Sequence, residues 1–224
     1  MGGMSDEIDV LERLLAERWS CRGYLDEPVE QATIERLLSA AQRTPSWCNT
    51  QPWEVGIFSG DAIADLRDVF ATDQRFTPDI AFPPGYEGVH ADRRRESGWQ
   101  LYEAVGVAKG DREGSAAQMM RNFDFFGAPH VAVVSAPTSL GVYGVVDCGL
   151  YVQTFLLAAQ ALGLGAVAQA AVAMKSELLH EKLGWGDDRQ VVCGISFGHP
   201  DPAHPTNSYR THRVALEESV TFLG

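Results

Sequence analysis

The hydrophobic positions of the chain form alternating helical and extended patterns. Apolar residues that recur three or four positions apart predict amphipathic helices. Helical patterns of this kind cover residues 5–17, 30–43, 63–70, 92–107, 112–125, 145–162 and 176–183. Alternating or continuous β-branched apolar runs predict strands. These runs cover residues 53–58, 130–135, 164–171 and 190–197.

Two stretches fit neither pattern. Residues 72–89 carry Pro78, Pro83 and Pro84 among aromatic side chains, and proline is poorly tolerated inside helices and strands. Together with the helix that follows, residues 72–107 are a candidate lid over a substrate. Residues 199–224 begin with prolines and end in apolar side chains that need a surface to cover. This pattern predicts a C-terminal arm that extends onto a partner subunit.

The helix predicted at residues 145–162 is apolar almost all round, which predicts a central buried helix. The chain has no internal repeat and no clear linker. We therefore expect residues 1–224 to form a single α+β domain in which helices surround a small central sheet.

Composition and charge exclude several classes of partner. The 224 residues include 18 Lys and Arg against 30 Asp and Glu, which gives a formal net charge of −12. This charge repels nucleic acids and anionic membranes, so neither is expected as a partner. The basic run Arg93-Arg94-Arg95 has acidic neighbours and is explained by ion pairs on a solvated helix. Without a signal peptide or an apolar run of ~20 residues, a cytoplasmic location is expected.

Common catalytic signatures are missing from the sequence. The phosphate-loop pattern, the G-x-G-x-x-G dinucleotide fingerprint and the G-x-S-x-G nucleophile pattern do not occur. The six histidines and four cysteines have no spacing typical of a metal site or a disulfide framework. We therefore expect an organic cofactor to carry the chemistry, with no catalytic side chain and no metal ligand.

Two polar segments are candidates for binding that cofactor. The segment Arg18-Trp19-Ser20-Cys21-Arg22 follows the first predicted helix and could bring two guanidinium groups to an anion. Arginines also stabilise a helix C-terminus through its dipole, and the residues alone leave this alternative open. The second segment is a proline-stiffened loop that suits a ring system carrying hydroxyl groups. It reads Pro45-Ser46-Trp47-Cys48-Asn49-Thr50-Gln51-Pro52-Trp53.

These segments resemble the motifs of the nitroreductase family of flavin enzymes. The family pattern is Arg-x-Ser-x-Arg, a Pro-Val pair, and then Pro-Ser-x-x-Asn-x-Gln-Pro-Trp, and the chain matches each part. The resemblance continues through residues 121–130, residues 149–165, and Gly198-His199-Pro200 with Arg213. It is nearest to nitrobenzoate-reductase-like members. It implies a nitroreductase-like fold with a mostly antiparallel sheet, and a homodimer that holds FMN at the subunit interface.

The resemblance also implies roles for individual residues. Arg18, Ser20 and Arg213 correspond to positions that hold the FMN phosphate or the neighbouring ribityl oxygens, and Trp19 lies between the first two. Arg22 corresponds to a basic position at the pyrimidine edge of the flavin. A cation there stabilises the negative charge that develops when the ring is reduced.

Three other segments supply further implied contacts. The loop that reaches the flavin from the partner subunit contains Pro45, Ser46, Trp47 and Asn49. The other polar edge of the pyrimidine is assigned to Asn122. The loop behind the flavin, where a backbone N–H points at N5, contains Gln169, Ala170 and Ala171. It departs from the Pro and Glu-Gly pattern of better-known members.

The two C-terminal arginines have a second explanation. Arg210 and Arg213 could pair with Glu217 and Glu218 as exposed ion pairs of little energetic effect. We favour cofactor contact for Arg213 and an ion pair for Arg210.

The leading hypothesis is an FMN-dependent oxidoreductase that takes hydride from NADH or NADPH. By a ping-pong scheme it would pass the hydride to a small aromatic acceptor, a nitro compound or a quinone. One alternative is reductive dehalogenation or flavin breakdown. A dehalogenating lid presents acidic, phenolic and ammonium groups to a zwitterion, and Glu87, Tyr86 and Lys109 are present, although their spacing does not assign them to that role. Another is a non-catalytic FMN sensor. The residues do not choose between NADH and NADPH.

Overall fold

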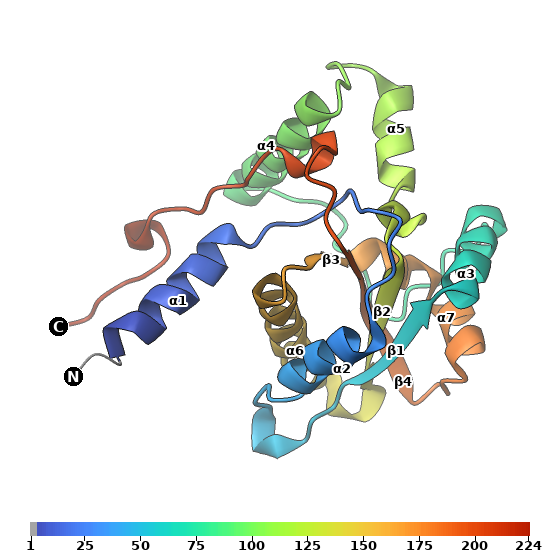
Figure 1. The fold of residues 1–224 in the computed structure, drawn as a ribbon, viewed down its shortest axis with the longest axis horizontal. Helices are drawn as coiled ribbons and strands as arrows, with labels where there is room; N and C mark the ends of the chain where they lie inside the picture. The colour runs from blue at the N-terminus through green and yellow to red at the C-terminus, as the bar shows by residue number, and fades with distance from the viewer. Residues whose placement is uncertain (1–3) are drawn as a thin grey trace.

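The centre of the molecule is a four-stranded antiparallel sheet (Figure 1). The computed structural model describes residues 4–224. The strand order is β1-β2-β4-β3, and each strand pairs antiparallel with its neighbours. The strands are β1 (Glu54–Ser59), β2 (His130–Pro137), β3 (Gly165–Gln169) and β4 (Arg189–Gly198). The predicted α+β class and the mostly antiparallel sheet are confirmed.

Helices cover both faces of this sheet. One face packs against α2 (Gln31–Ala41) and α6 (Gly141–Ala161). The opposite face packs against α3 (Asp61–Thr72) and α7 (Ser176–Leu183). Successive residues of β2 enter the two cores in turn, because side chains alternate across a strand. Burial on both faces explains why the strands are continuous apolar runs in the sequence.

Helix α6 is buried on one side only. Cys148, Tyr151 and Phe155 face the core, whereas Val142 and Tyr143 are 70% and 57% exposed. Within the predicted helix 145–162, Val146 and Leu150 are 52% and 45% exposed, so the prediction of a central buried helix is wrong for the single chain. The segment Thr138–Ala161 is long and apolar enough to cross a membrane by length and composition alone. Core helices share that property, and α6 packs against the sheet.

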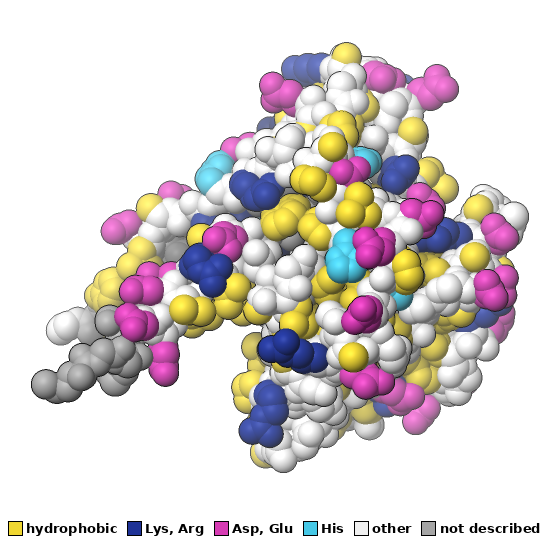
Figure 2. Space-filling model, in the orientation of Figure 1, with side chains coloured by type: hydrophobic (Ala, Val, Ile, Leu, Met, Phe, Trp, Pro, Cys, Tyr) yellow, Lys and Arg dark blue, Asp and Glu magenta, His cyan; other side chains and the backbone are white. Residues whose placement is uncertain are grey.

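Three helices lie away from the sheet. The helix α1 (Met4–Glu17) projects from the body beside the C-terminal arm, and the C-terminus lies on that side (Figure 1). It exposes Ile8, Leu11 and Leu15, and apolar side chains are visible on it in Figure 2. At another end lie α4 (Gly88–Ala104) and α5 (Arg112–Met120), neither of which has a buried residue.

Several element boundaries differ from the predicted ones. Helix α4 begins at Gly88, within the stretch expected to be irregular. Helix α5 ends at Met120, five residues early, and Phe125, which the pattern placed in this helix, and Phe126 have left-handed φ angles of 54° and 55°. Strand β3 ends at Gln169, and Ala170 begins a 3₁₀ turn.

His130 connects the start of β2 to two neighbouring segments. Its Nε2 accepts a hydrogen bond from the backbone N–H of Val29 at 2.9 Å, and Nδ1 lies 2.5 Å from the Ser59 hydroxyl. Burial, and secondarily the charge of His199, lowers the pKa of His130 below its ordinary value of 6.5. A proton on Nε2 would also face the Val29 donor. The folded protein therefore favours the neutral ring.

This environment predicts a loss of stability in mild acid. Because the unfolded chain binds the His130 proton more readily, the free energy of unfolding falls as pH drops below 6.5 toward the lowered folded pKa. Urea unfolding at about pH 7.5 and about pH 5 should show a smaller fall in His130→Gln than in the parent. Equal falls in the two proteins would contradict this role.

Candidate functional site

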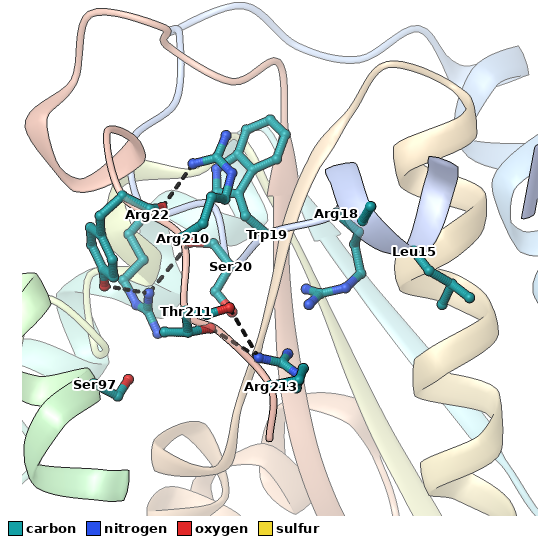
Figure 3. Close-up of a pocket in the computed structure, with 11 residues that line it drawn as sticks. Leu15, Arg18, Trp19, Ser20, Arg22, Ser97, Arg210, Thr211 and Arg213 are labelled. Carbon is teal, nitrogen blue, oxygen red and sulfur yellow. Dashed lines mark hydrogen bonds between the residues drawn. The ribbon is translucent and has the colours of Figure 1, made fainter. Parts of the chain in front are cut away.

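The end of α1, the residues that follow it and the residues near the C-terminus enclose a cavity of about 290 Å³, here called the arginine cavity. Figure 3 shows its side chains, which come from these segments and, at Ser97, from α4. Its lining includes Arg18, Trp19, Ser20, Arg22, Arg210 and Arg213. Within the described residues 4–224, the lining contains no Asp or Glu. Four guanidinium groups thus gather without a carboxylate, although the chain has a net charge of −12.

Backbone hydrogen bonds fix this segment to the sheet. Ser20 forms a parallel bridge with Ala166 of β3, and the Cys21 N–H donates to the Ala166 carbonyl at 3.2 Å. On the other side, the Asn207 side chain accepts from the Arg22 N–H at 3.1 Å. The segment is therefore held between the sheet edge and the C-terminal arm.

Arg18 and Arg213 face each other across the cavity (Figure 3). Burial, and secondarily the charge of Arg213, lowers the pKa of Arg18 from its ordinary value. The Arg213 guanidinium donates only to neutral acceptors, including the His212 carbonyl at 2.9 Å and the Thr211 hydroxyl at 3.2 Å. An anion between the two arginines would remove their repulsion and satisfy their free N–H groups.

Trp19 lines the same cavity and carries a buried, unpaired donor. Its Nε1 is buried and has no hydrogen-bond partner in the part of the chain that the structure describes. Buried polar atoms are rarely left unpaired, and this one lies beneath the cavity surface.

Arg210 lines the arginine cavity. The ion pair with Glu217 or Glu218 predicted for it is therefore wrong. Its guanidinium carbon lies 4.3 Å from the centroid of the Trp19 ring, and its Nη1 donates to the carbonyls of Asn207 and Tyr209 at 2.8 Å. Glu218 instead lies 3.6 Å from Arg93. The sequence pattern did not predict this position because Glu217 and Glu218, close by in the sequence, suggested an ion pair instead.

Arg22 connects the arginine cavity to a larger one of about 1030 Å³, here called the lid cavity. The lid cavity is lined mainly by residues 83–109. The Arg22 Nη1 lies 3.3 Å from the Tyr209 hydroxyl and 3.4 Å from the Ser20 carbonyl. Its guanidinium carbon lies 5.7 Å from the centroid of the Phe126 ring. An anion site and a wide aromatic cavity are thus adjacent.

Asn122 and Gln169 lie together, but neither lines the arginine cavity. The buried Gln169 side chain donates from Nε2 to the Asn122 carbonyl at 3.0 Å and accepts from the Ser196 hydroxyl. Its amide is therefore occupied by protein partners. Ala170 and Ala171 follow it in the 3₁₀ turn, so their proposed contact with a cofactor depends on the backbone.

Loss of the Gln169 amide should destabilise the fold. Gln169→Ala leaves the Ser196 hydroxyl without its acceptor and opens a void, at a cost of about 2–3 kcal/mol in the free energy of unfolding. Urea unfolding measures this cost. Gln74→Ala, at an exposed position, is the control and should change it by less than about 0.5 kcal/mol. A similarly small change for Gln169→Ala would contradict the buried hydrogen-bond role.

The loop with Trp47 lies at the opposite end of α6. The Trp47 N–H donates to the buried Asp147 carboxylate at 3.1 Å, and its ring centroid lies 4.7 Å from that of Tyr143. The 21 residues of α6 span about 30 Å. The cavity residue Ser20 pairs with Ala166 of β3, the strand that follows the C-terminal end of α6. Within one chain, the structure does not bring the arginines together with Pro45, Ser46, Trp47 and Asn49.

Other reactive groups lie outside these cavities. Burial raises the pKa of Cys148 and Cys193 to about 12, so both thiols stay protonated at neutral pH. Over residues 4–224, the structure has no group of three or more His, Cys, Asp or Glu side chains placed to hold a metal ion.

Comparison with known proteins assigns the chain to a family. The model of the Nitroreductase family matches residues 15–199, and the chain belongs to that family. It is 32% identical to the nitroreductase NfnB of Mycolicibacterium smegmatis, over 99% of this chain and 96% of that protein. It is also 32% identical to the 4-nitrobenzoate reductase of Nocardioides sp. (strain LMS-CY), over 96% of this chain and 91% of that one.

The fold agrees with this assignment. A crystal structure of the FMN-dependent nitroreductase NfnB from Mycobacterium smegmatis, in complex with NADPH, matches with a TM-score of 0.92 and 32% identity. The match covers 97% of this chain and 99% of that chain. The family and the nitroreductase fold expected from the sequence motifs are therefore confirmed.

Proposed function

We propose that the chain is an FMN-dependent oxidoreductase that uses NADPH to reduce nitroaromatic or quinone-type acceptors. The observation that carries this proposal is the arginine cavity, with four guanidinium groups and no carboxylate in its described lining. The similar protein solved with NADPH supports the choice of donor. Because NADPH is an intracellular reductant, the proposal includes a cytoplasmic location.

FMN fits the residues that line the arginine cavity. Arg18 and Arg213 would bind its phosphate, since a guanidinium fork matches phosphate oxygens and the dianion relieves their mutual repulsion. Ser20 would bind the remaining phosphate or ribityl oxygens, and Trp19 would contact the cofactor as a neighbouring part of the lining. When bound, FMN supplies a ring system that accepts a hydride from a nicotinamide and passes it on.

Arg22 would hold a positive charge beside the flavin. Its contacts are to a phenol and to a carbonyl, and both leave the guanidinium charge unneutralised. This charge favours the reduced, negatively charged ring over the oxidised one. Nearby, the lid cavity would hold donor and acceptor in turn, which gives ping-pong kinetics. Reduction of a nitro group to a nitroso group consumes one NADPH and one proton and releases one water.

A homodimer would complete each site. Pro45, Ser46, Trp47 and Asn49 lie too far from the arginines to serve the same FMN within one chain, so we assign them to the partner's site. The exposed apolar residues of α1 and α6, together with Phe222 of the arm, support burial against a second copy. Asp147 of the same chain would hold the Trp47 loop in place at the interface.

The zwitterion alternative lacks one of its groups. Tyr86 and Lys109 line the lid cavity, but Glu87 does not, and no other described residue supplies a carboxylate to that lining. A substrate ammonium group would therefore meet only cations and neutral groups. No contact among residues 4–224 favours a non-catalytic sensor over an enzyme.

The test is spectroscopic. The purified protein is mixed with FMN, freed of unbound flavin, reduced anaerobically with NADPH, and then given a nitroaromatic, a quinone or a halotyrosine. A flavin band that bleaches with NADPH and returns with a nitroaromatic or quinone is expected. Bound flavin that NADPH cannot bleach would contradict the reductase. Absence of bound flavin would contradict the cofactor assignment itself.

A further inference from the structure

The lid cavity has a lining that is unexpected for so acidic a protein. Its described lining includes four of the 18 Lys and Arg of the chain and none of the 30 Asp and Glu. The cations are Arg22, Arg94, Arg95 and Lys109. A cavity wall with one sign of charge concentrates ligands of the opposite sign.

Most of this charge is not neutralised by neighbouring groups. The Arg94 guanidinium lies 5.2 Å from the centroid of the Tyr86 ring. Within residues 4–224, neither Arg94 nor Lys109 forms an ion pair with a carboxylate. Arg95, by contrast, lies 2.9 Å from an Asp92 oxygen. Arg94 is therefore a free cation beside an aromatic ring in the cavity wall.

The same cavity presents several aromatic surfaces. The rings of Trp99 and Tyr102 meet edge to face with centroids 5.7 Å apart, and Tyr86 is 53% exposed. Aromatic side chains favour flat aromatic ligands by stacking or edge contact. Together with the free cations, they favour a ligand that is both aromatic and negatively charged.

We propose that the preferred electron acceptor is an aromatic anion, a ring that carries a carboxylate or a phenolate, and that Arg94 selects it. This inference rests on the reductase function proposed above and names the substrate class of that site. Arg22 is assigned to the flavin, which leaves Arg94 as the cation placed over a ring at the wall of the cavity. The acceptor's ring packs on the aromatic wall, and its charge pairs with the guanidinium.

A second source of negative charge is the 2′-phosphate of NADPH. Its recognition would use the same chemistry, but it would act on the donor half of the reaction. Comparing NADPH with NADH as the reductant therefore separates the two sources.

The experiment compares 4-nitrobenzoate with the neutral 4-nitrobenzamide, which has a similar shape. Because the amide withdraws electrons more strongly than the carboxylate, intrinsic reactivity opposes the expected preference for the anion. The parent enzyme should prefer the anion by about tenfold in kcat/KM. Arg94→Gln should lower that preference about tenfold, whereas Arg94→Lys should keep most of it. Arg112→Gln, which removes a cation from the neighbouring α5 outside this lining, is the matched control and should leave the preference unchanged.

Three outcomes would overturn the proposal. One is equal kcat/KM for the two acceptors, and another is an Arg94→Gln preference equal to the parent's. The third is that Arg94→Gln slows the bleaching of the flavin by NADPH but not by NADH, while the preference between the two acceptors stays the same. Arg94 would then bind the 2′-phosphate of the donor. If neither nicotinamide bleaches the flavin, the reductase proposal fails. The acceptor class is then decided separately by the Kd of each compound for the oxidised protein.

Discussion

Replacing Arg18 by glutamine should weaken FMN binding by about a hundredfold, because two charge-assisted hydrogen bonds to a phosphate are lost. Arg18 is the half-buried cation of the arginine cavity, and neutral groups cannot replace its fork of donors. Quenching of FMN fluorescence by the flavin-free protein gives the Kd of parent and variant. Arg13→Gln, at an exposed position of α1 paired with Glu17, is the matched control and should bind FMN normally.

The same variant has a second signature that separates binding from folding. Burial and the charge of Arg213 both disfavour a charged Arg18 in the folded chain, which is why its pKa is lowered. Flavin-free Arg18→Gln should therefore melt at the same temperature as the parent or higher, while FMN stabilises it less. A flavin-free variant that melts well below the parent would indicate a structural role for Arg18 instead.

The largest stability effect is expected at Phe155. Phe155→Ala should lower the free energy of unfolding by about 3–5 kcal/mol, because truncation of a fully buried ring loses its packing and leaves a cavity. The ring meets Phe197 edge to face at a centroid distance of 5.4 Å, and Phe197 in turn stacks on His130. The void would thus open between α6 and the centre of the sheet.

Urea unfolding of the flavin-free protein measures this effect without a contribution from cofactor binding. Phe155→Leu keeps most of the apolar volume and should cost about 1–2 kcal/mol. Similar losses for the two variants would mean that the core around Phe155 collapses to fill the space. That result would contradict a tightly packed junction between α6 and β4.

The sequence predicted secondary structure best where burial alone determines it. The amphipathic spacing of α2, α3 and α7 and the apolar runs of the four strands correspond to elements that the structure contains. The end of α5 could not be predicted, because left-handed φ angles at Phe125 and Phe126 depend on tertiary contacts. Nor could the pattern of α6 distinguish a helix covered by its own chain from one that leaves an apolar face open.

The candidate site was predictable only through motif resemblance. Arg18 and Arg213 are separated by almost the whole chain. Helical or strand periodicity does not predict which distant residues lie close together in space. The structure explains it, because the bridge from Ser20 to β3 and the Asn207 contact bring the two ends together. Arg210 was missed since its partner is the face of an indole ring, which charge patterns along a sequence do not reveal.

The different anchoring of the two cavities has an evolutionary consequence. The arginine cavity is bonded to the sheet through the backbone of Ser20 and Cys21, so its position is fixed by the sheet edge. Helix α4, which lines the lid cavity, has no buried residue. Substitutions along α4 can therefore accumulate at little cost in stability. Acceptor range can diverge rapidly between descendants of such a protein while flavin affinity is inherited unchanged, which makes α4 the segment to randomise in directed evolution.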